Sequence, residues 1–175
     1  VFSSNNLGEM QWKAEGVSGG TETDCVSNAE NSAHADATKK VNFLYGNLGD
    51  IWNVNFIDSA TPDLTYLRDN NGNVLSLTAG AVKTTYTYNS RDLVETESVE
   101  VDGKSFNVDY HYANSGVLSG VTYPNNDRVD FSPNGFGQAT EVKRQLRNGT
   151  PSQVYASNAM YYPAGSINTF HYGNG

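Results

Sequence analysis

The sequence lacks most of the features that mark common functional classes. It contains a single cysteine, Cys25, so an intrachain disulfide framework is excluded and the redox compartment stays open. No apolar run approaches the roughly 20 residues that a membrane-spanning helix needs, and no signal-peptide pattern is visible at its start. We therefore expect neither a disulfide-bonded scaffold nor a segment inserted in a membrane.

Basic residues are also scarce. Lys and Arg number 11 against 19 Asp and Glu, which gives a formal net charge of −8. Nucleic acids and anionic membrane surfaces attract proteins through basic patches. Neither is therefore expected as a main partner.

Motifs for metals and cofactors are missing as well. Cys25, His34, His111 and His171 do not show the spacing of a thiolate–imidazole metal site. The run 69–73 lacks the residue order of a calcium loop and is explained by a tight turn. No glycine loop that could hold a phosphate is present. We expect no metal and no cofactor.

Glycine and tyrosine are abundant, with 17 and 11 copies, whereas hydrophobic residues make up only 37% of the chain. This composition is typical of β-strands joined by many turns. The tyrosines also recur in a pattern, and repeats of this kind decide the architecture of a chain.

The pattern is a nine-residue template, seen best at 110–118. Its first and third places are aromatic, small polar residues follow, glycine occupies the seventh place and an aliphatic residue the ninth. Similar stretches occur at 2–10, 43–51, 66–74, 86–94, 129–137 and 159–167. The residues that define these copies are Tyr66, Asp69, Gly72, Tyr86, Tyr88, Asn89, Asp92, Tyr110, Tyr112, Gly116, Phe131, Gly135 and Gly165.

Each copy predicts a β-hairpin. Tyr110 and Tyr112 are two residues apart, so on a strand they point to the same face. The polar run then breaks the strand, and a short hairpin loop ends in a residue at positive φ, where glycine costs least. Asp92 replaces this glycine in one copy, and Asp is among the few other residues that tolerate the conformation. Asp102–Gly103 is a further hairpin signal.

The chain 1–175 is thus predicted to be a run of β-hairpins, each stabilised by stacking on its neighbours. Residues 16–40 interrupt the pattern as an irregular insertion, with a short helix expected near 31–39. Because 170–175 starts a copy and stops at its turn, we expect a fragment of a longer chain.

The template resembles the YD repeats of RHS proteins, a family that includes bacterial polymorphic toxins, insecticidal toxin complexes and teneurins. Tyr86, Tyr88, Asn89 and Val94 carry this resemblance, as do 110–118 and 66–74. The resemblance implies an all-β fold in which antiparallel hairpins form a spiralling sheet, part of a shell or barrel that encloses a C-terminal toxin domain. It also implies a secreted or cell-surface protein of bacterial origin. No counterpart of the family's aspartate-based cleavage segment is present, so no catalytic residue is expected.

Two other functions compete with a structural one. The first is a module that binds carbohydrate or a cell-surface partner, because aromatic faces pack well on sugar C–H groups. Trp12, Tyr123 and Tyr155 are its candidate residues, since they lie outside the template places. Template tyrosines are instead expected to pack as cross-strand pairs. The second is a hydrolase that uses acidic pairs, Glu95 with Glu97 or Asp127 with Asp130.

Overall fold

The computed structural model describes residues 2–15, 39–56, 60–145 and 153–174. These residues form β-strands and no helix, which confirms the all-β prediction. The helix expected near 31–39 lies outside the described residues, except that Lys39 begins a strand. The strands are β1 (Phe2–Ser4), β2 (Met10–Glu15), β3 (Lys39–Tyr45), β4 (Ile51–Phe56), β5 (Leu64–Arg68), β6 (Val74–Ala79), β7 (Val82–Tyr88), β8 (Val94–Val101), β9 (Lys104–Tyr112), β10 (Leu118–Thr122), β11 (Arg128–Asp130), β12 (Val142–Gln145), β13 (Gln153–Tyr161) and β14 (Ile167–Tyr172).

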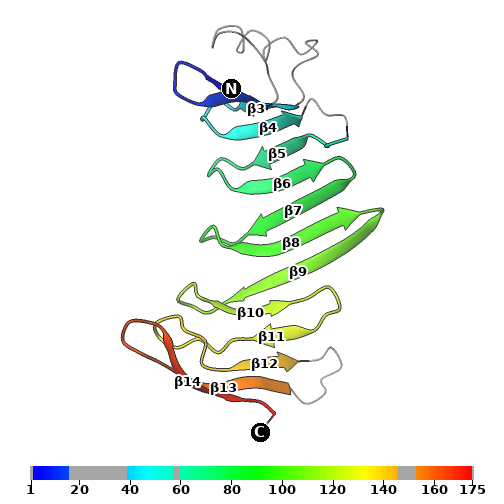
Figure 1. The fold of residues 1–175 in the computed structure, drawn as a ribbon. Helices are drawn as coiled ribbons and strands as arrows, with labels where there is room; N and C mark the ends of the chain where they lie inside the picture. The colour runs from blue at the N-terminus through cyan, green and yellow to red at the C-terminus, as the bar shows by residue number, and fades with distance from the viewer. Residues whose placement is uncertain (1, 16–38, 57–59, 146–152, 175) are drawn as a thin grey trace. The chain divides into compact units, whose positions relative to one another are not determined.

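The chain divides into two compact units, Val1–Thr84 and Thr85–Gly175, with the boundary inside β7. Within each unit the strands pair in sequence order, and each pairing is antiparallel (Figure 1). Such a meander is the arrangement that successive hairpins produce. The prediction of repetitive antiparallel hairpins is confirmed.

A two-residue loop, the commonest hairpin connection, joins β8 to β9. Asp102 and Gly103 both have positive φ, 50° and 69°, and Val101 pairs directly with Lys104. Two central residues at positive φ define a type I′ turn, whose twist matches that of the flanking strands. The Asp-Gly signal in the sequence therefore predicted this turn correctly.

The buried core of the described residues is small. Trp12, Val54 and Val121 are its buried hydrophobic side chains, at 7–8% exposure. A sheet that has no helix packed against it leaves much of both faces accessible. Large apolar side chains on the strands are consequently exposed, among them Trp52, at 44%, and Met160, at 60%. Main-chain pairing and turn geometry must therefore contribute much of the stability.

One template copy was predicted in the wrong register. The sequence suggested that Phe131 occupies the third place and Gly135 the seventh. In the structure the turn starts at Asn134, and Gly137, not Gly135, has the positive φ, 82°. Phe131 therefore occupies the first place. The error of two residues arose because strand side chains repeat every two residues, so the shift preserves the face on which Phe131 lies.

Candidate functional site

The repeated turn is the most regular feature of the structure. Eight turns share two main-chain hydrogen bonds: the fourth-place N–H donates to the eighth-place carbonyl (2.8–3.0 Å), and the seventh-place N–H to the fourth-place carbonyl (2.8–3.1 Å). The turns are 5–9, 46–50, 69–73, 89–93, 113–117, 123–127, 134–138 and 162–166. Their seventh residues all have φ between 57° and 89°. This is a type I turn followed by a bulge residue at positive φ.

An Asn or Asp in the fourth place stabilises four of these turns. Its side-chain Oδ1 accepts hydrogen bonds from the N–H groups of the sixth and eighth places. For Asn134 the donors are Phe136 and Gln138, at 2.9 and 3.0 Å. The other three turns start with Asn5, Asp69 and Asn89. Because short polar side chains mimic a turn in this way, the sequence signal has a local cause.

Asp69 is the charged member of this set. A hydrogen bond from the Asn73 side chain is the main influence that lowers its pKa below the ordinary value. Burial opposes this effect, and the main-chain N–H groups of Asn73, Asn71 and Gly72 add to it. The carboxylate therefore serves as a turn acceptor, as the sequence analysis expected of the run 69–73.

The third-place tyrosines connect successive hairpins. The hydroxyl of Tyr45 donates to the carbonyl of Met10 at 2.8 Å, and that of Tyr112 to the carbonyl of Val94 at 2.8 Å. Tyr161 repeats the contact with the carbonyl of Ala139, at 2.7 Å. Each acceptor is the ninth-place residue of the preceding hairpin. The tyrosine thus fixes one turn against the next.

Arginines make similar contacts. Arg91 donates through Nη1 to the carbonyl of Asn114, at 2.9 Å, which links two neighbouring turns. Arg68 replaces the third-place tyrosine of its copy and pairs with Asp50 of the preceding turn, at 3.4 Å. The loss of an aromatic residue in this copy is therefore offset by an ion pair at the same position.

Two of the first-place tyrosines, Tyr86 and Tyr110, lie beside Glu97. The hydroxyl of Tyr110 donates to Oε2 of Glu97 at 2.8 Å. This hydrogen bond, with burial and the charge of Glu97, raises the pKa of Tyr110 to about 12. Burial first, and then Glu97, also raises the pKa of Tyr86. Burial raises the pKa of Tyr112.

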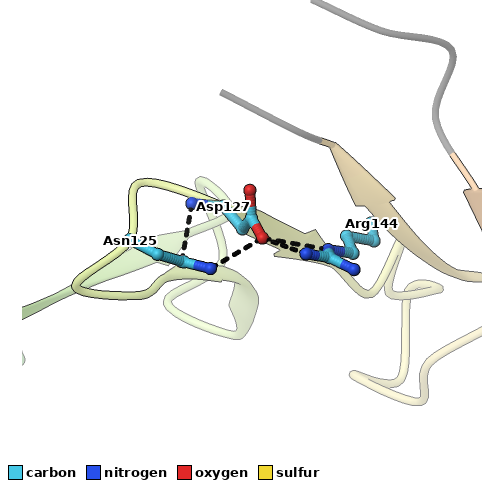
Figure 2. Close-up of polar contacts among 3 residues, drawn as sticks. All are labelled: Asn125, Asp127 and Arg144. Carbon is cyan, nitrogen blue, oxygen red and sulfur yellow. Dashed lines mark hydrogen bonds and ion pairs between the residues drawn. The ribbon is translucent and has the colours of Figure 1, made fainter. Parts of the chain in front are cut away.

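Three of the four acids considered for hydrolysis, Glu97, Asp127 and Asp130, have structural partners. Glu97 accepts the hydrogen bond from Tyr110, and Asp130 pairs with Arg128 at 2.7 Å. Asp127 is buried, with 8% of its surface exposed. It forms an ion pair with Arg144 and also accepts a hydrogen bond from Asn125 (Figure 2). The pKa of Arg144 is raised, chiefly by Asp127 and next by Tyr155. Carboxylates held in this way are acceptors for fixed donors, which does not favour acid–base chemistry.

Two of the three candidate ligand residues meet at one groove. Tyr123 and Tyr155 are 45% and 41% exposed and line a groove of about 460 Å³ together with Arg144. Its other lining residues are Pro124, Asn125, Asp127 and Val129. Figure 2 shows Asn125 and Arg144 approaching the carboxylate of Asp127 from opposite sides. We call this the Tyr123 groove.

The third candidate, Trp12, does not fit a ligand role. It is 7% exposed, and it lies on β2 in the other unit from the Tyr123 groove. An indole covered to this extent cannot offer its face to a sugar ring. The prediction for Trp12 was wrong because its position outside the template suggested exposure, whereas Trp is a residue that packing buries readily.

The histidines that the structure describes have neighbours unrelated to metal binding. His111 Nε2 lies 2.8 Å from Thr122 Oγ1, and His171 Nδ1 lies 3.3 Å from Asn158 Nδ2. No group of three possible metal ligands occurs among the described residues. Cys25 and His34 lie outside them. No helix within the described ranges is long and apolar enough to cross a bilayer.

Sequence comparison gives no relatives: no protein-family model and no curated protein matches the chain.

Solved structures with the same fold do exist. The crystal structure of TcdB2-TccC3 without its hypervariable C-terminal region aligns with 99% of this chain at a TM-score of 0.73 and 12% identity. The crystal structure of TcdB2-TccC3-Cdc42 aligns with 93% at a TM-score of 0.62 and 10% identity. In both cases the alignment spans only 9% of the other chain. The resemblance predicted from the template is thus confirmed at the level of the fold.

Proposed function

We propose that the chain is a non-catalytic scaffold segment, a run of stacked hairpins that forms part of the wall of an RHS-type shell. The observation that carries this proposal is the repeated turn, which occurs eight times with the same hydrogen bonds. A ligand site is normally built once, whereas a structural unit is repeated. The third-place tyrosines support the proposal, because each one links a hairpin to its predecessor.

The exposed apolar side chains agree with a role inside a larger assembly. The described residues bury three hydrophobic side chains, those of Trp12, Val54 and Val121, but leave Leu7, Trp52, Met160 and Ile167 among those exposed. A β-sheet buries the apolar side chains of its faces only where another layer packs against it. In the proposed shell, further hairpins and an enclosed C-terminal toxin domain supply these contacts. The parent protein is then a secreted or cell-surface protein of bacterial origin.

The parent protein tests this proposal. Intact mass spectrometry of the native protein, followed by electron microscopy of the purified particle, is expected to reveal a much longer chain and a hollow shell. A native chain of about 175 residues would overturn the proposal, since a wall of this length cannot enclose another domain.

The Tyr123 groove favours a second candidate function, the binding of carbohydrate. Tyr123 and Tyr155 lie 32 positions apart in the sequence and yet line one groove. Aromatic rings stack on the C–H faces of sugars, and Asn125 Nδ2, which donates one N–H to Asp127, carries a second N–H beside them. Since Arg144 is already paired with Asp127, the groove suits a neutral saccharide better than an anionic one.

A glycan panel distinguishes the two functions. Binding is expected to quench tyrosine fluorescence and to be lost in Tyr123→Ala and Tyr155→Ala. Tyr172→Ala is the matched control, because Tyr172 is 68% exposed and lies outside the groove. If no glycan on the panel binds, or if the control variant loses binding equally, the groove is not a carbohydrate site.

A further inference from the structure

The hairpin β8–β9 extends beyond the strand that follows it (Figure 1). β10 pairs only with the second half of β9, from Asp109 to Tyr112. In the described part of the chain, residues 104–108 have β8 on one side and no strand on the other. This short open edge lies in the middle of the second unit, where a five-residue strand follows a nine-residue one.

Two residues of this edge direct their main-chain groups to the open side. Val101 pairs with Lys104 around the two-residue turn, and in such a hairpin these two residues exchange both main-chain hydrogen bonds. Along an antiparallel ladder, hydrogen-bonded pairs alternate with pairs that are not hydrogen-bonded. The N–H and C=O groups of Ser105 and Asn107 therefore point away from β8, toward the position that a further strand would occupy.

The same two residues line a hollow of about 400 Å³. One wall of the hollow is the hairpin β8–β9, and the other is the turn 123–127, through Tyr123 and Pro124. None of the residues that the structure shows around it is basic. We call it the Asp109 hollow; its lining residues include Thr96, Ser98, Ser105, Asn107, Asp109 and Tyr123.

Asp109 is the unpaired acid of this hollow. It lies on the same face of β9 as Asn107, two residues away. Asn107 accepts a hydrogen bond from Ser98 at 2.7 Å, whereas no side chain in the described ranges forms a hydrogen bond or ion pair with the carboxylate of Asp109. Glu97 also lines the hollow, but its carboxylate accepts the hydroxyl of Tyr110 on the opposite face.

The neighbouring arginines already have acidic partners. Thr122 pairs with both Asp109 and Arg128, so Arg128 lies two strands away in the same row. Its Nε pairs with Asp130 at 2.7 Å. Across the turn, in the Tyr123 groove, Arg144 pairs with Asp127. The groove and the hollow share Tyr123 and Pro124. An arginine thus neutralises the acid in the groove, whereas the acid in the hollow lacks a cation.

We propose that the Asp109 hollow binds an extended peptide segment that carries a lysine or arginine. The segment pairs antiparallel with Ser105 and Asn107, and its basic side chain contacts Asp109 beside the ring of Tyr123. Main-chain hydrogen bonds to a sheet edge supply affinity in strand addition, and a cation is attracted to an aromatic face. The net charge of −8 favours a basic partner further. This site depends neither on the scaffold role nor on carbohydrate binding.

A synthetic peptide tests the site. It has seven residues, alternating valine and threonine as strand-forming residues, with arginine in the centre. The matched control carries citrulline in place of arginine, which has nearly the same shape but no charge. Fluorescence anisotropy of the labelled peptides measures their binding to the whole chain. We expect saturable binding of the arginine peptide, weakened by added salt, and binding about tenfold weaker for the citrulline peptide.

N-methylation tests the main-chain pairing. A residue directly opposite Asn107 lies on the same face, so the arginine and the residues two positions away from it direct their N–H groups toward β9. Methylating the nitrogens of peptide residues 2 and 6 is therefore expected to abolish binding. Methylating those of residues 3 and 5, whose N–H groups point away from β9, is expected to retain it.

Asp109→Asn tests the carboxylate and is expected to weaken binding of the arginine peptide about tenfold. Glu95→Gln is the matched control, because it removes one negative charge from the same hairpin and Glu95 does not line the hollow. Should Asp109→Asn fail to fold, the comparison of arginine with citrulline on the unaltered chain still decides the role of charge.

The proposal would be overturned by equal affinity of the arginine and citrulline peptides, by the absence of saturable binding, or by equal effects of Asp109→Asn and Glu95→Gln. Equal affinity of the two methylated peptides would exclude strand pairing. Agmatine carries the guanidinium group without a peptide chain; if it displaces the peptide at the peptide's own concentration, the hollow is a site for small cations instead. The glycan panel tests the Tyr123 groove separately.

Discussion

The hydroxyl of Tyr110 on β9 donates a hydrogen bond to Oε2 of Glu97 on β8, and the two oxygens are 2.8 Å apart. The hydrogen bond and the negative charge both disfavour the tyrosinate, which explains why the pKa of Tyr110 rises to about 12. The contact therefore links the stability of this hairpin to pH.

The first prediction concerns alkaline unfolding. The pKa of Tyr110 is about 10 in the unfolded chain and about 12 in the folded one. Below pH 10 both states keep the proton, so the stabilising effect is complete. As pH rises from about 10 to 12, the unfolded state loses the proton first, and the free energy of unfolding falls. Urea unfolding between pH 9 and 12 measures this decrease.

Glu97→Gln is expected to reduce the steepness of that decrease, because it weakens the hydrogen bond and removes the negative charge, two of the causes that raise the pKa of Tyr110. Glu95→Gln is the matched control, since Glu95 lies two residues away on the same strand and is not among the causes of the shift. An equal change of slope in both variants would show that general charge, rather than this contact, controls the alkaline transition.

The second prediction concerns the residue at positive φ. Gly116→Val is expected to destabilise the fold by about 1–3 kcal/mol, because a β-branched side chain is strained at φ of 89°. The new Cβ would also lie 3.4 Å from Nη1 of Arg91. Asp92→Gly should be neutral or stabilising. Chemical denaturation measures both changes.

Gly135→Val provides the control for this experiment. Gly135 is absent from the positive-φ residues, and no atom lies within 4 Å of an added Cβ. Its replacement is expected to change stability by less than about 0.5 kcal/mol. A loss as large as that of Gly116→Val would contradict the turn register described here.

The third prediction concerns the fourth place. Asn89 accepts hydrogen bonds from the N–H groups of Arg91 and Leu93, at 2.9 and 3.2 Å. Ala113 occupies the same place in the next hairpin and cannot do so. We expect Asn89→Ala to destabilise by about 0.5–2 kcal/mol and Ala113→Asn to stabilise by a smaller amount. Thermal unfolding followed by circular dichroism measures both, and a shift of the same sign in both variants would refute the capping role.

The fourth prediction concerns the links between hairpins. Tyr112→Phe removes the hydroxyl that donates to Val94 and is expected to cost about 0.5–1.5 kcal/mol. Tyr172→Phe, at a residue 68% exposed, should have no measurable effect. Hydrogen exchange provides a second measurement, since the loss at Tyr112 should increase exchange in the turn 89–93. If both variants retain wild-type stability, the tyrosine hydroxyls do not connect the hairpins.

The sequence predicted the fold well where the signal was local. An Asx in the fourth place, with glycine or Asp in the seventh, forms a turn by contacts within five residues, so the turns at Asp69 and Asn89 could be recognised directly. The shifted copy at Asn134 has the same pair, Asn134 and Gly137, and these two residues would have given the correct register. Aromatic residues were the weaker guide, because they recur every second position.

Contacts between hairpins could not be predicted in the same way. Arg144 and Asp127 are separated by 17 positions, and Tyr155 joins Tyr123 at one groove only because of the register of β11, β12 and β13. That register depends on how many residues the intervening turns contain. The turn 123–127 lacked the aromatic signal, and Asn126 rather than glycine adopts the positive φ of 63°.

Seven of the repeated turns join an odd-numbered strand to the next strand, so within each unit they lie on one side of the meander, and every one of them has five residues. The connections on the other side differ in length: two residues join β8 to β9, five join β10 to β11, and positions 16–38 separate the paired strands β2 and β3. Evolution can therefore lengthen or replace loops on the second side while the first preserves the spacing of the strands. The same asymmetry offers protein engineers a place to insert foreign peptides.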